Sequence, residues 1–184
     1  MQKIFLTIVL VFIASAGFAQ LLHGPNGYML VNLSSEKCKF WATTTRSLSN
    51  INTQTGKFET VVYNESFVSA NDTATNVFND DYLNYKEFPE LRLNGFVYNF
   101  DKMDLSKEFR QTITLRGVLY MHGIKKDVEY TGNIYNRPQL MMLDYELYVD
   151  PNDFSLKAPA NLASCISPLM LIKGNVQLVD MSKE

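Results

Sequence analysis

The chain has 184 residues, a formal net charge of −2 and a hydrophobic share of 46%. No basic run exceeds two residues, which excludes the charge pattern of a nucleic-acid-binding protein. Beyond the N-terminal segment, no stretch approaches the roughly 20 apolar residues of a membrane-spanning helix. The composition therefore predicts one soluble domain that is large enough to form its own hydrophobic core.

The N-terminal segment has the layout of a secretory signal peptide. Lys3 is followed by the apolar run Ile4–Ile13, and the small residues Gly17 and Ala19 suit a cleavage site after Ala19. A retained N-terminal anchor is the alternative. We expect an exported protein, either periplasmic or secreted. The expected organisation is a signal peptide over residues 1–19 and a single domain over residues 20–184.

The first part of that domain contains three expected strands. Each alternates apolar and polar residues or is rich in Val, Tyr and Phe, which is typical of β-structure. A short leader, Gln20–Gly27, ends in the turn-like sequence Gly-Pro-Asn-Gly, and the polar stretch Asn50–Lys57 is expected to connect two strands. The expected strands are Tyr28–Leu33, Lys37–Thr44 and Phe58–Phe67.

A short amphipathic helix is expected over Asn71–Tyr85. Its first residues are good helix caps, and Val77, Phe78 and Tyr82 recur at helical spacing on one apolar stripe. Phe88 precedes a proline and so ends the helical region. Asp80 and Asp81 fall on the polar side of this helix and are expected to face solvent.

The second part of the chain contains five expected strands. In one of them, alternate residues from Ile113 to Met121 share one apolar face. His122-Gly123 is expected to form a tight turn, and Lys125-Lys126-Asp127 a polar corner. The strands are Glu90–Phe100, Phe109–Met121, Val128–Asn136, Gln139–Asp150 and Leu169–Val179.

Eight strands at regular intervals, most of them joined by hairpin-length connections, indicate an antiparallel meander. We therefore predict an all-β, lipocalin-like fold: an eight-stranded antiparallel up-and-down barrel with one short inserted α-helix. A barrel of this size is just wide enough to hold one small ligand. Its interior is either a filled core or a pocket for an apolar chain.

The two cysteines, Cys38 and Cys165, allow a disulfide in an oxidising compartment. Such a bridge closes a long loop and would stabilise the fold by roughly 4 kcal/mol if unstrained. Two buried free thiols are the alternative, because the sequence does not show whether the cysteines lie within bridging distance.

Catalytic and metal-binding patterns are sparse. The only histidines are His23 and His122, and the chain has no Gly-x-Ser-x-Gly elbow and no His-x-His, His-Glu-x-x-His or Cys-x-x-Cys pair. We expect no enzyme, no metal and no cofactor. An exported hydrolase using His122 stays as an alternative, as does copper capture by His23 if cleavage occurs one residue later.

Three stretches, taken in order, resemble the YceI-like family. Val77–Gly95 matches that family's helix, aromatic-proline stop and following strand; Leu115–Val128 matches its Gly- and Lys-containing hairpin; Leu147–Leu156 matches its Asp-Phe element. The resemblance implies a lipocalin-like barrel that binds a polyisoprenoid or another long amphiphile without catalysis. It also implies a periplasmic or secreted carrier.

Strand alternation supplies candidate lining residues for such a ligand, each of which could equally be plain core. The expected partner is a long-chain lipid or isoprenoid, not a nucleic acid. Transient membrane contact through Lys125-Lys126 and a homodimer stay open, as does a filled barrel that serves as an interaction module. The candidates are Phe67, Leu93, Leu119, Met121, Leu143, Tyr145 and Leu147, with Phe78 and Tyr82 as a lid.

Overall fold

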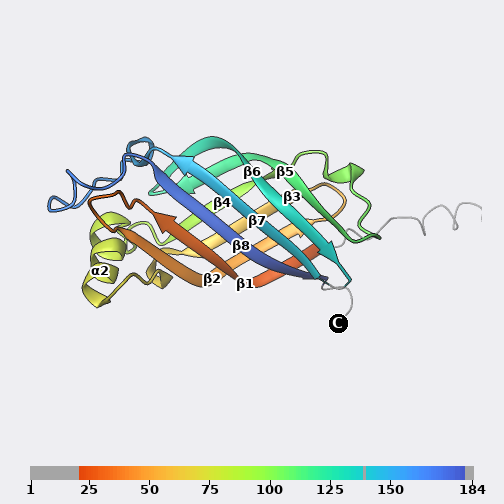
Figure 1. Ribbon diagram of the computed structural model, residues 1–184, viewed down its shortest axis with the longest axis horizontal. Helices are drawn as coiled ribbons and strands as arrows, with labels where there is room; N and C mark the ends of the chain where they lie inside the picture. The colour runs from red at the N-terminus through yellow and green to blue at the C-terminus, as the bar shows by residue number, and fades with distance from the viewer. Residues whose placement is uncertain (1–20, 139, 181–184) are drawn as a thin grey trace, which may run out of the picture.

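The computed structural model describes residues 21–138 and 140–180, so the expected signal peptide lies outside the described residues. Each strand pairs antiparallel with the next, and the last pairs with the first, which confirms the predicted closed eight-stranded up-and-down barrel (Figure 1). The strands are β1 (Leu21–Asn32), β2 (Trp41–Asn52), β3 (Lys57–Tyr63), β4 (Glu90–Val97), β5 (Phe109–Met121), β6 (Ile124–Arg137), β7 (Leu140–Val149) and β8 (Met170–Asp180).

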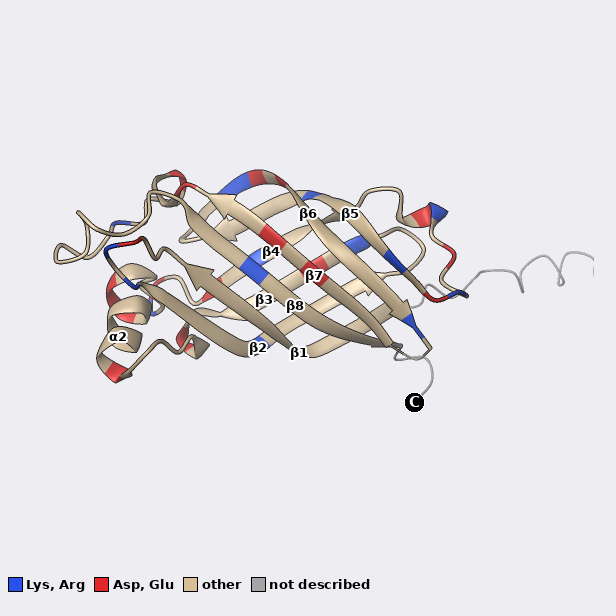
Figure 2. Cartoon of the chain, in the orientation of Figure 1, with Lys and Arg blue, Asp and Glu red and all other residues tan. Residues whose placement is uncertain are grey.

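The period-two pattern of the strands separates an apolar interior from a polar exterior. On β7, Leu143, Tyr145 and Leu147 are buried, whereas Glu146 and Tyr148 are exposed. Figure 2 shows the charged residues as separate bands along the strands and as a group in the helical segment. Among the described residues, no buried side chain is charged.

The two ends of the barrel are built differently (Figure 1). One end, called here the lidded end, carries the connections β1–β2, β3–β4, β5–β6 and β7–β8. These include η1 (Asn64–Ser66), α2 (Asp72–Asn76), η2 (Val77–Tyr82) and η4 (Pro151–Phe154). The other, called the hairpin end, carries β2–β3, β4–β5 with η3 (Phe100–Lys102), and β6–β7. None of the described helices is long and apolar enough to cross a membrane.

The expected leader is wrong, because the Gly-Pro-Asn-Gly sequence lies inside β1. The pairing of β1 with β2 shifts register between Gly24 and Gly27, as in a β-bulge. A bulge accommodates Pro25, which cannot donate to the ladder. A Cβ on Gly24 would lie 2.3 Å from Val176 Cγ2, so only glycine allows this close approach of β1 to β8.

The expected polar corner at Lys125-Lys126-Asp127 is also wrong, because these residues belong to β6. The turn is made by His122 and Gly123 alone, with φ values of 51° and 77°. Positive φ at both central residues is the backbone of a two-residue hairpin whose twist matches the strands. Exposed strand positions tolerate charge, so the charge run did not mark a corner.

The inserted helix begins as expected: the Asn71 side chain accepts a hydrogen bond from the Ala74 amide over 2.9 Å. Regular α-helix ends at Asn76, and η2 continues as a π-helix in which the Leu83 amide donates to the Phe78 carbonyl over 2.9 Å. This wider turn places Phe78 and Tyr82 on the buried side. π-Turns of this kind are frequent at functional sites.

Candidate ligand-binding site

All nine candidate lining residues are buried, with exposed fractions of 5% or less. Six lie on the inner wall of the barrel, and Phe67, Phe78 and Tyr82 lie at the lidded end. Strand alternation, and helical spacing for Phe78 and Tyr82, thus assigned each of the nine to the apolar interior. That they contact a ligand stays a prediction. The six wall residues are Leu93, Leu119, Met121, Leu143, Tyr145 and Leu147.

An aromatic cluster closes the lidded end. The Phe78 ring lies 5.5 Å from Phe40, 5.6 Å from Phe67 and 5.8 Å from Tyr82, and Phe40 meets Tyr82 edge-on at 5.3 Å. Such pairs add about 0.5–1.5 kcal/mol beyond their burial. Phe40 was not among the lining candidates, although its alternation in the sequence could have identified it.

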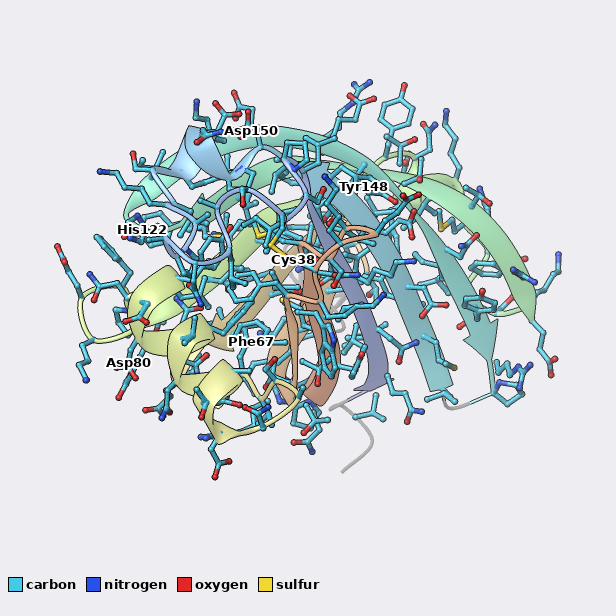
Figure 3. The ribbon with its side chains drawn as sticks, turned by 60° about the vertical axis from the view of Figure 1, so that its left-hand side comes forward. Cys38, Phe67, Asp80, His122, Tyr148 and Asp150 are labelled. Atoms are coloured by element: carbon cyan, nitrogen blue, oxygen red, sulfur yellow. A yellow bond between two sulfur atoms is a disulfide. The ribbon has the colours of Figure 1, made fainter. Side chains whose placement is uncertain are left out.

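The helical segment is fixed to the rim by polar contacts. The Asn79 side-chain amide donates to the Phe67 carbonyl over 2.9 Å. Figure 3 shows Phe67 on the barrel side of the helical segment and Asp80 on its outer side. There Asp80 pairs with Lys86 over 2.9 Å. Burial, and secondarily the charge of Asp150, raises the pKa of Tyr82. The phenol therefore stays protonated and neutral inside the lid.

A disulfide joins two connections of the lidded end, which answers the question that the sequence left open. Cys38 in the β1–β2 loop and Cys165 in the β7–β8 connection are bonded, with their Cα atoms 5.5 Å apart (Figure 3). Beside the bond, the Ser167 amide donates to the Leu33 carbonyl over 2.7 Å. The β1–β2 loop and the β7–β8 connection are thereby held together at the lidded end.

The His122 side chain contacts two neighbouring segments of the lidded end. Its Nδ1 lies 3.0 Å from the Phe154 carbonyl oxygen, which can only accept, so Nδ1 carries the proton. Its ring centroid lies 4.1 Å from that of Phe88. The β5–β6 turn is therefore bound both to η4 and to the segment before β4. These contacts give His122 a packing role and offer no acid–base relay.

The other histidine and the lysine pair of β6 also make structural contacts. His23 Nδ1 lies 2.7 Å from Asn50 Oδ1 on the neighbouring strand. Over the described ranges, no group of three or more His, Cys, Asp or Glu side chains is arranged to hold a metal. Lys126 pairs with Asp153 over 3.0 Å, and Lys125 lies over the Tyr120 ring. Membrane contact through these lysines stays a prediction.

A polar group lies within the otherwise apolar interior. It consists of Ser49, Thr60, Tyr130 and Tyr145, called here the hydroxyl cluster. Ser49 Oγ and Thr60 Oγ1 are 2.9 Å apart, and Thr60 also interacts with Tyr145. Burial raises the pKa of Tyr145 to about 12, while the interaction with Thr60 opposes that rise. Of these four residues only Tyr145 is among the lining candidates, because alternation of apolar side chains does not mark an inward Ser or Thr.

These features define a class: a closed up-and-down barrel with an uncharged interior, an aromatic lid at one end and no described catalytic constellation. No family model and no curated protein matches the chain. Several solved structures share its fold.

A polyisoprenoid-binding domain from Saccharophagus degradans, implicated in plant cell wall breakdown, is 16% identical with a TM-score of 0.73, over 88% of this chain and 98% of that one. Burkholderia cenocepacia BcnA is 11% identical with a TM-score of 0.67, over 82% and 95%. The Campylobacter jejuni YCEI protein is 14% identical with a TM-score of 0.52, over 71% and 78%. The YceI resemblance carried by the three motifs is thus confirmed at the level of the fold.

Proposed function

We propose that this chain is an exported, non-enzymatic binding protein that holds a long-chain amphiphile, either a polyisoprenoid or a fatty-acid-like lipid, inside the barrel. The observation that carries the proposal is the closed barrel whose described interior is mainly apolar, free of charged side chains and covered by an aromatic lid. The fold shared with the S. degradans polyisoprenoid-binding domain supports the same role.

The physical driving force is burial of the lipid chain. Each CH₂ that leaves water contributes about 0.8 kcal/mol, so ten of them contribute about 8 kcal/mol before ordering costs are subtracted. An interior without charged side chains does not compete with this gain, because it requires no ion to be desolvated. Methionines such as Met121 and Met141 can adapt to an irregular chain.

One observation favours a second function, that of a filled barrel acting as an interaction module. Leu119 is 0% exposed and Leu93 is 1% exposed, so their side chains contact other protein atoms and not open space. A lipid could reach them only after the lid opens and the interior repacks. Under the second function, the interior would never open and partners would bind the outer wall.

Export, transient membrane contact and a homodimer belong to the same proposal. A carrier must meet a bilayer to load, and a secretory signal over residues 1–19 would bring it there. Sequencing the N-terminus of protein recovered outside the cytoplasm tests export, with Gln20 as the expected first residue. An unprocessed N-terminus in that fraction would contradict it.

Mass spectrometry of organic extracts from the natively purified protein tests the binding function. We expect a long-chain lipid in near-stoichiometric amount, absent from an unrelated exported protein purified in parallel. Fluorescent isoprenoid and fatty-acid probes added to delipidated protein provide the complementary measurement. If no lipid is extracted and no probe is taken up, the barrel is a filled core and the second function replaces the first.

A further inference from the structure

The hydroxyl cluster contains one hydroxyl that the described protein atoms leave unsatisfied. Tyr130 is 5% exposed, and its phenolic oxygen is buried without a hydrogen-bond partner among the described residues. Its ring is set edge-on to Phe58 at 6.5 Å and inclined to Tyr145 at 5.8 Å. A buried hydroxyl without a partner is destabilising, so its retention inside an apolar barrel calls for an explanation.

The other three hydroxyls of the cluster already have partners. Ser49 and Thr60 are hydrogen-bonded to each other, and Tyr145 interacts with Thr60. Tyr145 is also held in position by β8, because a Cβ on Gly174 would lie 2.1 Å from Tyr145 Cζ. The cluster is therefore an ordered polar group with one hydrogen-bonding position left for a further partner.

The surroundings restrict what that partner can be. Every buried polar side chain in the described ranges is a Ser, Thr, Asn or Tyr, so no interior cation is present there to balance a carboxylate or a phosphate. Burial raises the pKa of Tyr130, and the neighbouring Tyr145 adds to that effect, so Tyr130 remains a proton donor. A neutral acceptor can bind this donor without the cost of desolvating a charge. An anion would have to lose its hydration to enter the interior.

We propose that the hydroxyl cluster is the polar subsite of the barrel interior, where Tyr130 donates to an uncharged oxygen of the bound lipid. The protein then selects long-chain amides, alcohols or other neutral oxygen-bearing lipids over fatty acids and over plain hydrocarbons. This inference rests on the proposed binding function and adds to it the chemical class of the ligand's polar group.

The test is competitive capture. Delipidated protein is incubated with an equimolar mixture of a fatty amide, a fatty alcohol, a fatty acid and an alkane of one chain length, then re-isolated. The captured lipids are quantified by mass spectrometry. One added hydrogen bond predicts that amide and alcohol exceed alkane by about tenfold, and that the acid is disfavoured. Equal capture, or a preference for the acid, overturns the subsite while the binding function stands. Capture of none overturns both.

Tyr130→Phe removes the hydroxyl and keeps the ring. We expect it to lower the amide-to-alkane ratio about tenfold without lowering alkane capture. Its melting temperature without ligand should be unchanged or higher, because the hydroxyl has no described protein partner. The matched control is Tyr148→Phe on the exposed face of β7, which should leave the ratio unchanged. An equal loss of all four lipids, or a clear drop in melting temperature, would assign Tyr130 to packing and overturn the subsite.

Discussion

The two ends of the barrel close by different means. At the hairpin end, the described closure is non-covalent: the Gly56 amide donates to the Asn52 carbonyl within one turn, and Phe100 of η3 is buried over Gly56. At the lidded end, a covalent bond also joins segments near opposite ends of the chain. The Cys38–Cys165 bond has a sequence separation of 127, and the β5–β6 turn contacts both Phe88 and Phe154.

This difference gives the two ends of the barrel different roles in ligand entry. Local turns fix the hairpin end as soon as the adjacent strands pair. The lidded end depends on contacts that form only when the barrel has closed, and two of the four rings of its aromatic cluster, Phe78 and Tyr82, belong to η2 instead of to the sheet. We therefore expect opening for ligand entry at the lidded end, with the hairpin end staying shut. The following experiments address that contrast, in order of decreasing expected effect.

Loss of the disulfide should have the largest effect. The double variant Cys38→Ser/Cys165→Ser should lose about 5 kcal/mol of unfolding free energy, because the bond closes a loop of more than 100 residues. Urea denaturation with and without a reductant measures this loss. Reductant should destabilise the wild type to the same level and leave the double variant unchanged. An unchanged urea midpoint would mean that the lidded end does not depend on the bond.

The lidded end also marks the limit of what the sequence could predict. Alternation and turn residues predicted the barrel, its eight strands and the limits of β5, because each of these depends on neighbours in the chain. Whether Cys38 is bonded to Cys165, and whether His122 packs on Phe88, depend on residues brought together when the barrel closes. No local pattern encodes them.

The barrel interior also shows what the sequence could and could not predict. Period-two alternation placed the seven strand candidates inside, as helical spacing did for Phe78 and Tyr82, because which face of an element is buried is a property of that element's own sequence. It could not show that Ser49, Thr60, Tyr130 and Tyr145 meet, because they come from four different strands. The available signal is the presence of small polar residues, such as Ser47 and Ser49, at inward positions of β2.

A matched pair of phenylalanines compares the two ends directly. Phe78 at the lidded end and Phe100 at the hairpin end are both buried, so Phe→Ala at either should cost about 3–5 kcal/mol of unfolding free energy. Urea midpoints check that the losses are similar. Release of a bound fluorescent lipid, followed by stopped flow, should accelerate only in Phe78→Ala. Equal acceleration in Phe100→Ala would show that both ends open.

A pair of turn glycines should show a smaller difference between the two ends. Here the variant at the hairpin end should lose more stability than the variant at the lidded end. Gly56 and Gly123 both have positive φ, 67° and 77°. A Cβ on Gly56 would lie 2.6 Å from Phe100 Cβ and 3.0 Å from the Val97 carbonyl, whereas a Cβ on Gly123 meets only the edge of the Phe88 ring at 2.9 Å. Gly56→Ala should therefore cost about 3 kcal/mol and Gly123→Ala about 2 kcal/mol. Thermal and urea denaturation measure both; equal losses would mean that the hairpin end yields as readily as the lidded end.

Two variants of His122 decide between packing and catalysis, and His122→Asn should give the smallest effect of all. His122→Ala loses the Nδ1–H bond to Phe154 and the contact with Phe88, and places alanine at a φ of 51°, so it should cost about 2 kcal/mol. His122→Asn should cost less, because asparagine tolerates this backbone region and retains a donor. Denaturation midpoints give the two losses, and lipid uptake should be the same in both variants as in the wild type. If the chain were a hydrolase using His122, both substitutions would instead abolish turnover of an ester substrate, and asparagine would rescue stability without rescuing activity.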